Sequence, residues 1–433
     1  ANSGDGRGDI GRGNAGRLRM TARVAFPARG RPEAEIFDLL ERMREHDADW
    51  RGGRVPLYVF GALPEIEEIG RRAYMAYFTE NALGARRAFR SLGRMEAEIE
   101  DMALDLFHAP ESARATVTSG GTESILLAVK ACRDSFRERR GERARGNLVL
   151  PETAHPAFDK AARLMDLEVR RVAVGSDLRA DTGALAAAID RETILLAGSV
   201  PCFPYGVIDS IPELSELALA RGLWLHVDGC VGGYLAPFAR ALGRPVPEFD
   251  FALPGVTSLS ADLHKFGFCP KPASTILFRD QSAAECAGFD LDVWPNGRFK
   301  TRTFVGTRPG GSVAAAWVVL NYLGREGYRA LAARLLAMRD AYISGIEAIP
   351  GMRVFGRPEL TIIAFGAADT DMDAVARAME ARGWVAGLVR KPPGLHIMAS
   401  LLHEGAREQY LADLAAAVAS APAGRAAEVS AIY

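Results

Sequence analysis

The chain has 433 residues, of which 48% are apolar and 25% are charged, as in an ordinary soluble protein of two or three domains. Its 53 lysines and arginines nearly cancel its 54 acidic residues, which argues against a dedicated nucleic-acid or membrane-surface binder. The longest uncharged run, residues 193–208, is too short for a membrane span, which needs about 20 apolar residues. The first 20 residues hold no apolar core, so we expect no secretory signal.

The cysteines show no C-x-x-C pair and no even framework. This pattern favours reduced thiols in a cytoplasm over disulfides or a zinc site. The five cysteines are Cys132, Cys202, Cys230, Cys269 and Cys286.

The predicted elements begin after a Gly- and Arg-rich segment, residues 1–32, which we expect to be a flexible arm. Apolar residues at helical spacing predict a helical segment over residues 33–110. Over residues 111–325, short β-branched runs alternate with helices, which predicts a large α/β domain with a mainly parallel sheet covered on both faces. Residues 326–433 predict a small C-terminal α/β domain.

Individual elements follow from the same patterns. The expected helices are a first one beginning near Pro32, then residues 65–78, 93–107, 313–323 and 328–348. The expected strands are residues 115–118, 147–150, 168–172, 193–199, 223–227, 258–260 and 274–278 in the large domain, and 360–365 and 394–399 in the small one.

The first chemical motif is Ser119-Gly120-Gly121-Thr122, where an apolar strand runs straight into an amphipathic helix. Glycines let the backbone approach a ligand, and a helix N-terminus offers free N–H groups and a partial positive charge. The Thr122 hydroxyl adds a further donor. The motif therefore fits a phosphate cradle, and it also fits an ordinary helix cap.

The second motif, HVDGCVGGY, follows an apolar strand and puts Asp228 at the strand end, where ligands of open α/β sheets gather. A carboxylate there pairs with a protonated ring nitrogen or caps a turn. We expect His226 to point to the opposite face of the strand, and therefore expect no metal site.

The third motif, SADLHKFGFCPK, places Lys265 after His264 in a turn between two apolar strands. Burial beside Phe266 and Phe268 would lower the pKa of the Lys265 amine, which could then act as a nucleophile that forms a Schiff base. Lys271 adds a second cation. Taken alone, either lysine also fits a solvated surface position.

The fourth motif, FVGTRPGG at residues 304–311, is a glycine-rich turn before a helix and fits anion binding or simple capping. In chain order, the cradle, His155, Asp228 and Lys265 are the groups that a pyridoxal-phosphate enzyme needs. His155 would stack on the cofactor ring, and Asp228 would keep the ring nitrogen protonated. The sequence therefore predicts pyridoxal 5'-phosphate as the cofactor.

At these residues the chain resembles the sphingosine-1-phosphate lyases, in their soluble bacterial type, within the group II pyridoxal-phosphate-dependent decarboxylase family. The similarity runs from about Val55 to His403. The segments that carry it are MEAEIEDMA, VTSGGTESILLAVKACRD, AHPAFDKAA, FPYGVIDSIPEL, LHVDGCVGG, GVTSLSADLHKFGFCPK, GTRPGG and PPGLHIMASLLH.

The resemblance implies pyridoxal-phosphate fold type I, which is aspartate-aminotransferase-like, with a mainly parallel seven-stranded sheet and a small C-terminal α/β domain. It also implies a homodimer with shared active sites, in which Gly306 and Thr307 come from the partner subunit. The implied catalytic residues are Lys265, His155, Asp228 and Lys271. The implied cofactor-binding residues are Gly121, Thr122, His155, Asp228, His264, Lys265, Gly306 and Thr307.

The implied reaction is a retro-aldol cleavage of a phosphorylated β-hydroxy amine to an aldehyde and phosphoethanolamine. In it Lys265 is the Schiff-base lysine, and Lys271 binds the substrate phosphate.

The chain departs from the family in two segments near the expected substrate site. The G-A-V-Y-W-like segment reads VPLYVFG, where Tyr58 is offset and Val59 lies nearer the tyrosine's place. The N-P-L-H-P-like segment reads NALGARRAFRS, where Gly84 replaces the histidine. Three arginines follow that fit either an anion clamp or a solvated face, namely Arg86, Arg87 and Arg90.

Two enzymatic functions stay open, a carbon–carbon lyase and an amino-acid decarboxylase with the same fold and cofactor. Both break a bond at Cα, and the side chains that clamp the substrate select the bond. A third reading, a non-catalytic protein of this fold, predicts loss of Lys265 or Asp228, and both are present.

Overall fold

The computed structural model of the chain describes residues 23–142 and 145–424. Two compact units divide between Asp47 and Ala48. In the first, the predicted opening helix is confirmed as α1 (Glu33–Arg44), and none of its residues is buried. Most of the arm predicted over residues 1–32 lies outside the described residues.

A seven-stranded sheet dominates the second unit, with the order β1-β7-β6-β5-β4-β2-β3. The pairs from β6 to β3 are parallel, whereas β7 runs antiparallel to both of its neighbours. The predicted mainly parallel sheet is therefore confirmed. The strands are β1 (Arg114–Thr118), β2 (Asn147–Pro151), β3 (Glu168–Val172), β4 (Thr193–Ser199), β5 (Trp224–Asp228), β6 (Val256–Ala261) and β7 (Ser274–Phe278).

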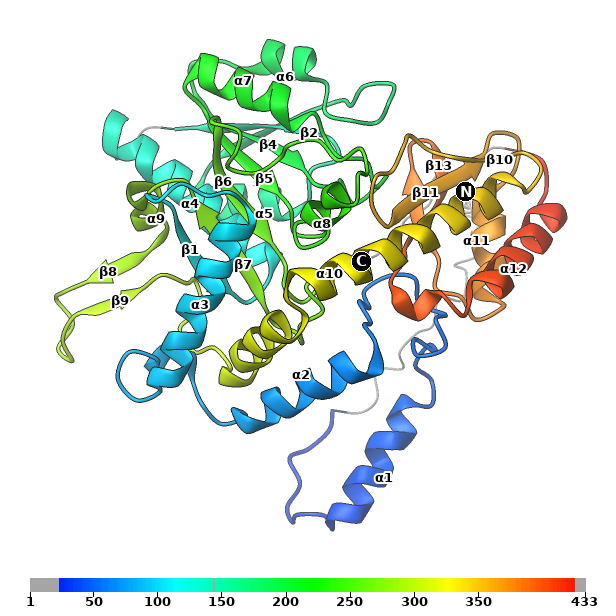
Figure 1. The fold of residues 1–433 in the computed structure, drawn as a ribbon, viewed down its shortest axis with the longest axis horizontal. Helices are drawn as coiled ribbons and strands as arrows, with labels where there is room; N and C mark the ends of the chain where they lie inside the picture. Colours follow the sequence, from blue (N-terminus) through cyan, green and yellow to red (C-terminus); the bar gives the residue numbers. More distant parts are fainter. Residues whose placement is uncertain (1–22, 143–144, 425–433) are drawn as a thin grey trace, which may run out of the picture. The chain divides into compact units, whose positions relative to one another are not determined.

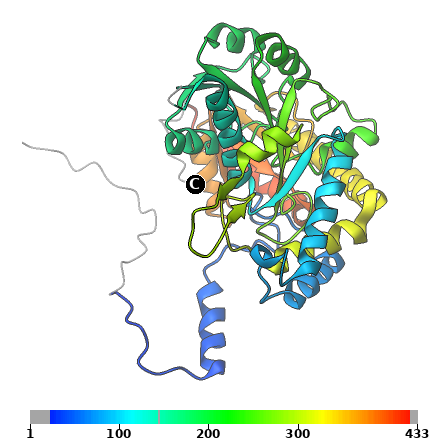
Figure 2. The same cartoon turned by 90° about the vertical axis from the view of Figure 1, so that its left-hand side faces the viewer.

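Helices cover both faces of this sheet (Figures 1 and 2). Successive residues of β5 enter different cores, because strand side chains alternate between faces. Trp224 belongs to the buried cluster that contains Phe158, and Leu225 to the one that contains Leu214. The Trp224 face is covered by α4 (Gly121–Arg140), α5 (Ala157–Met165) and α9 (Gln281–Ala287). The Leu225 face is covered by α3 (Arg90–Leu106), α6 (Thr182–Ala188), α7 (Ile211–Arg221), α8 (Ala236–Ala241) and α10 (Gly310–Glu347).

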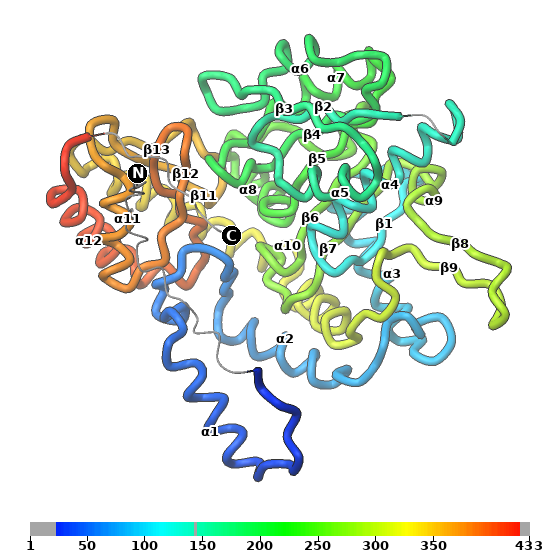
Figure 3. Tube along the Cα trace, turned by 180° about the vertical axis from the view of Figure 1, so that it is seen from behind, coloured from blue at the N-terminus to red at the C-terminus, as the bar shows by residue number. Residues whose placement is uncertain are grey.

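The helix α10 runs from the large sheet to a smaller antiparallel sheet (Figures 1 and 3). The helices α11 and α12 lie beside that smaller sheet as well. Residues 313–323 and 328–348 are expected as two helices, and α10 does consist of two helical stretches that meet in a kink at the non-helical Gly324. The smaller sheet has the order β10-β11-β13-β12. Its elements are β10 (Met352–Val354), β11 (Ile362–Ala367), α11 (Met372–Glu380), β12 (Gly387–Arg390), β13 (Pro393–Met398), η2 (Leu401–His403) and α12 (Arg407–Ser420).

Two further features frame the large sheet. The segment before it holds α2 (Pro64–Ala76) and η1 (Ala82–Gly84), and the helices expected over residues 65–78 and 93–107 are confirmed as α2 and α3. A ribbon of β8 (Phe289–Leu291) and β9 (Phe299–Thr301), which the sequence did not predict, extends from the sheet in Figure 1 and faces the viewer in Figure 2. None of the described helices combines the length and apolar character that crossing a bilayer requires.

Candidate active site

A cavity of about 1510 Å³ lies at the carboxyl ends of the parallel strands. Its wall includes Asp228 at the end of β5, Lys265 and Lys271 in the turn between β6 and β7, and His155 in the loop after β2. His264 lines it as well. The structure thus brings together all the predicted catalytic residues, because parallel strands deliver their carboxyl ends to one edge of a sheet.

The amine of Lys265 is held by Asp262, three residues earlier in the same turn. The Lys265 Nζ lies 3.0 Å from Asp262 Oδ2. Burial alone would lower the pKa of Lys265, but the negative charges of Asp262 and Asp228 outweigh it and the pKa is raised. The lowered pKa expected from the neighbouring phenylalanines is therefore wrong, because a buried carboxylate faces the amine.

The Asp228 carboxylate is kept ionised at the cavity wall. Its Oδ1 accepts the backbone N–H of Cys230 at 3.1 Å and the Ser260 hydroxyl at 3.5 Å. Burial would raise the pKa of Asp228, but the charge of His155 and the hydrogen bonds from the side chain and the backbone N–H of Cys230 more than offset this, and the pKa is lowered. Hydrogen bonds to the charged form favour that form.

The ring of His155 is oriented by its own loop. The Ala157 backbone N–H donates to His155 Nδ1 at 3.1 Å, so the neutral ring carries its proton on Nε2. Desolvation lowers the pKa of His155, which favours the neutral ring. The guanidinium of Arg171 holds the loop by donating to three carbonyl oxygens, those of Pro151, Glu152 and Ala154, at 3.3, 3.0 and 3.0 Å.

The glycine turn at the start of α4 fits closely beside these groups. A Cβ on Gly121 would lie 2.5 Å from Cys230 Sγ, and a Cβ on Gly120 would lie 3.4 Å from the His264 ring. The turn therefore needs glycine for the backbone to approach the cavity floor. The next residue, Thr122, is exposed at the first turn of α4.

The predicted partner-subunit residues lie apart from this cavity. Thr307 Oγ1 accepts from Asn81 Nδ2 at 3.4 Å, and the nearest contact for a Cβ on Gly306 is Leu83, 4.0 Å away. Neither Gly306 nor Thr307 lines the cavity within the described chain. The three arginines of the departing segment are exposed and also lie outside the described cavity wall; they are Arg86, Arg87 and Arg90.

Another part of the cavity wall is apolar and cationic. Tyr58 lines it in a left-handed backbone conformation (φ 58°), whereas Val59 lines a neighbouring pocket instead. Lys271 Nζ lies 5.9 Å from the centre of the Phe60 ring, and burial, followed by the charge of Lys265, lowers the pKa of Lys271. Arg390 and Lys391, from the end of β12, add further cations that the sequence did not single out.

Sequence reasoning missed Glu123 and Asp262 and misplaced His226. Glu123 accepts the Ser119 N–H at 2.7 Å and the Phe304 N–H at 2.8 Å, so that it joins the first and fourth motifs. His226 does not point away from Asp228: residues two apart on a strand share a face, and His226 hydrogen-bonds to Ser260 beside Asp228. That spacing was readable in HVD.

Comparisons with known proteins agree with this geometry. Residues 91–368 match the pyridoxal-dependent decarboxylase conserved domain. The chain belongs to the pyridoxal-dependent decarboxylase family. Its cofactor is pyridoxal phosphate, and the chain is a lyase of that family.

Several known proteins are similar to this chain over most of its length. A sphingosine-1-phosphate lyase of Oryza sativa subsp. japonica is 37% identical over 405 residues, covering 92% of this chain and 74% of that protein. The solved sphingosine-1-phosphate lyase of Burkholderia pseudomallei superposes with a TM-score of 0.88 at 36% identity, over 93% of this chain and 94% of that one. A probable L-aspartate decarboxylase of Pyrococcus furiosus is 33% identical, over 83% and 94%.

The cavity fits the family's cofactor on three features of this structure. It offers a primary amine, Lys265, and an ionised buried carboxylate, Asp228. The turn at Gly121 leaves no room for a side chain. Within the described residues, no three His, Cys, Asp or Glu side chains gather as a metal site requires.

Proposed function

We propose that this chain is a pyridoxal-phosphate-dependent carbon–carbon lyase. Its substrate would be a phosphorylated β-hydroxy amine of the sphingosine-1-phosphate type. Cleavage of the Cα–Cβ bond would give a long-chain aldehyde and phosphoethanolamine, with the β-hydroxyl oxygen kept as the aldehyde oxygen. The solved and curated lyase relatives support this reaction over others of the family.

The observation that carries the proposal is Lys271. It shares one cavity with Lys265, its side chain is exposed at the cavity wall, and no described carboxylate forms an ion pair with it. An unpaired cation at a cavity wall can bind an anion, and a phosphate is the anion that a lyase substrate brings. The apolar wall beside it, which includes Tyr58 and Phe60, suits a hydrocarbon chain.

The groups on the cofactor side would divide the work as follows. Lys265 would hold the cofactor through its amine, and Asp228 would pair with the ring nitrogen. His155 would pack on the ring, and His264 would bind the phosphate together with Gly121 and Thr122. When bound, the cofactor withdraws electrons from the breaking bond.

The protonation states of these side chains fit the proposed roles. Lys265 must shed a proton before its amine can react, and the ion pair with Asp262 Oδ2, 3.0 Å away, keeps the amine protonated until then. His155 presents Nε2–H, since Ala157 occupies Nδ1. Asp228 stays ionised.

We further propose that two copies form a homodimer and that Gly306 and Thr307 complete the partner's site. Both residues lie outside the cavity of their own chain. The segment that leads to these residues carries exposed apolar side chains: Phe304 is 65% exposed, and Trp294 of the β8–β9 ribbon is 48% exposed. Large exposed apolar side chains gathered in one region mark interaction surfaces.

We infer that the protein works in a reducing cytoplasm. All five cysteines are free, and Cys286 alone is not buried. Thiols that form no disulfide suit that compartment.

Product analysis tests the proposed reaction. Cofactor-loaded protein would be incubated with sphingosine-1-phosphate or with L-aspartate, and the products read by mass spectrometry. Aldehyde together with phosphoethanolamine is the expected result. Release of carbon dioxide from L-aspartate without any aldehyde from the phosphorylated amine would contradict the proposal and favour the decarboxylase.

A further inference from the structure

Polar side chains form a continuous file along β5 and β6, on the face of the sheet that α4 and α5 cover. Trp224, His226 and Asp228 are two residues apart on β5 and share this face. On β6, Ser258 pairs with His226 and Ser260 with Asp228 in the strand register. None of the five is more than 9% exposed, so they form a polar file inside a core.

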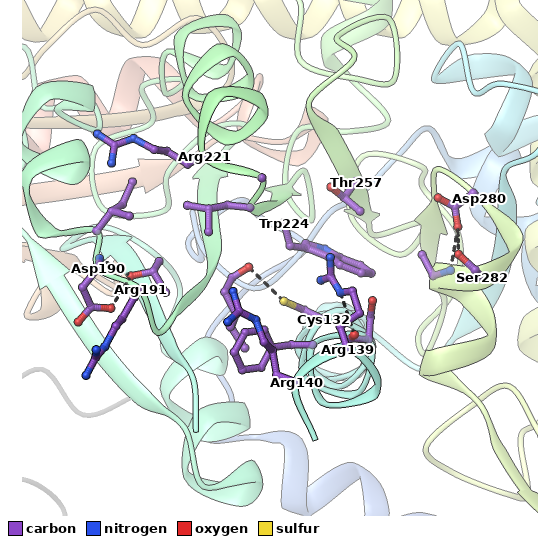
Figure 4. Close-up of a pocket in the computed structure, with 18 residues that line it drawn as sticks. Cys132, Arg139, Arg140, Asp190, Arg191, Arg221, Trp224, Thr257, Asp280 and Ser282 are labelled. Carbon is purple, nitrogen blue, oxygen red and sulfur yellow. Dashed lines mark hydrogen bonds between the residues drawn. The ribbon is translucent and has the colours of Figure 1, made fainter. Parts of the chain in front are cut away.

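Hydrogen bonds join the whole file. Trp224 Nε1 donates to Ser258 Oγ at 2.7 Å, and that oxygen lies 2.8 Å from His226 Nδ1. His226 Nε2 lies 3.1 Å from Ser260 Oγ, which donates to Asp228 Oδ1 at 3.5 Å. The file starts at the amino end of β5, where Trp224 lines a groove of about 870 Å³ (Figure 4), and ends in the active-site cavity.

Trp224 and Asp228, the two ends of the file, fix the direction of its hydrogen bonds. An indole N–H can only donate, and an ionised carboxylate can only accept. Ser258 accepts from Trp224, and among its described partners only His226 Nδ1 can accept its hydroxyl hydrogen, so Ser258 donates to Nδ1. Nε2 then carries the ring proton and donates to Ser260, whose hydroxyl hydrogen is left for Asp228.

The opposite tautomer would break this order. With the proton on Nδ1, the unprotonated Nε2 would compete with Asp228 for the single hydroxyl hydrogen of Ser260. An imidazolium would leave the Ser258 hydroxyl hydrogen without an acceptor among its described partners. Burial lowers the pKa of His226 to about 4, so the ring is neutral at neutral pH.

A second donor supports the same arrangement. Cys230 Sγ lies 3.2 Å from Ser260 Oγ, and burial raises the pKa of this thiol well above its usual value, so that it remains a donor. Ser260 then accepts from His226 and Cys230, which fills both lone pairs of its oxygen. Its one hydrogen has Asp228 as its remaining partner.

We propose that His226 is a positioning residue that aims the Ser260 hydroxyl at Asp228 and so fixes the carboxylate that pairs with the cofactor ring. This inference rests on the role proposed above for Asp228. A fixed donor stabilises the ionised form of a carboxylate and holds its lone pairs in one direction. The histidine acts at a distance, through a serine, and touches neither cofactor nor substrate.

Cofactor affinity of the cofactor-free protein tests this directly. The variants His226→Phe and Ser260→Ala should each weaken cofactor binding about 10-fold, the usual cost of a lost hydrogen bond to a charged group. The double variant should be no weaker than either single variant, because both remove the same donor. His226→Gln, whose amide nitrogen can replace Nε2–H, should restore most of the affinity.

A second readout is independent of the cofactor. The carboxyl carbon of Asp228, followed by NMR in the cofactor-free protein labelled at aspartate, should protonate at higher pH in His226→Phe than in the wild type. The ionisable groups that influence Asp228 are His155, His226, Cys230 and Lys265. Phe158→Leu is the matched control, because Phe158 packs edge-on against the same imidazole, with ring centres 5.7 Å apart, and makes no hydrogen bond in the file.

The outcomes separate this inference from the proposed function. If Asp228→Asn weakens cofactor binding but His226→Phe changes neither affinity nor the Asp228 titration, the positioning role is overturned. If Asp228→Asn leaves cofactor binding unchanged, the proposed role of Asp228 fails, and the NMR titration still decides whether His226 acts on it. Should His226→Phe not fold, Ser260→Ala decides by the same two readouts.

Discussion

The two walls of the active-site cavity are built in different ways. On the cofactor wall, Asp228 and His155 are held by backbone N–H donors, and Lys265 by a buried carboxylate in its own turn. On the substrate wall, Arg390 and Lys391 are exposed and make no ion pair among the described residues. Under the proposed function, the chemistry depends on groups fixed at strand ends, whereas substrate choice depends on unpaired cations from other segments.

Removing the Lys265 amine should have the largest effect on the cofactor wall. Lys265→Ala should lower turnover by at least ~10⁴-fold, since the group that holds the cofactor is lost. Steady-state assays with saturating cofactor measure this, with thermal unfolding as the check on folding. A variant that keeps a tenth of wild-type turnover would contradict the assignment.

The corresponding change on the substrate wall should act on binding. Lys271→Met keeps the apolar stem and should raise KM for the phosphorylated amine about 10- to 100-fold, the value of a hydrogen bond to a charged group. The KM for the same amine without its phosphate should not move. Equal losses for both amines would show that Lys271 does not recognise the phosphate.

Placing a charge in the exposed apolar surface tests whether the active site needs a second copy of the chain. Trp294→Asp should weaken self-association about 30-fold or more, as loss of an aromatic anchor does. Sedimentation across a concentration series measures it, and turnover should fall with dilution. Leu219→Asp, at a side chain of similar exposure on α7, is the control and should leave association unchanged.

The raised pKa of Lys265 predicts a pH dependence. Because the amine is protonated at neutral pH, capture of cofactor by the cofactor-free protein should speed up as pH rises toward the raised pKa. Asp262→Asn removes the main negative charge beside the amine. The profile of capture rate against pH should therefore shift to lower pH, giving about 10-fold faster capture at pH 7. Stopped-flow absorbance measures the rate.

Asp250→Asn provides the control for this change. Asp250 is also buried, but it pairs with His108 outside the cavity. Its capture profile should match that of the wild type. A profile for Asp262→Asn that does not shift would show that Asp262 leaves the Lys265 amine unperturbed.

The smallest expected effect is at the cavity rim. Arg390→Gln and Lys391→Gln should each raise KM for the phosphorylated amine about 3-fold, because exposed charges are screened by water and salt. The effect should vanish at high salt. Arg357→Gln, an exposed arginine that does not line the described cavity, should change nothing. A loss as large as that of Lys271→Met would move phosphate recognition to β12.

The cofactor wall was predictable from the sequence for a physical reason. Asp228, His155 and Lys265 follow apolar strand patterns, and the topology of a parallel sheet brings such ends together. The register also places His226 beside Asp228, although the sequence interpretation put it on the wrong face. The direction of the Lys265 pKa needed the turn geometry that puts Asp262 3.0 Å away.

The substrate wall was less predictable because its parts are distant in sequence. Tyr58 precedes the sheet, and Arg390 follows it by more than a hundred residues. No local pattern ties these positions to one cavity. The β8–β9 ribbon escaped prediction as well, since its two strands have three residues each and contain no clear alternation.

One competition experiment tests the central claim most directly. Wild-type enzyme would receive equal amounts of sphingosine-1-phosphate and its unphosphorylated form, and mass spectrometry would follow aldehyde, phosphoethanolamine and ethanolamine over time. We predict aldehyde in step with phosphoethanolamine, with little or no ethanolamine. Ethanolamine formed as fast as phosphoethanolamine would contradict phosphate recognition, and the absence of aldehyde would contradict the lyase.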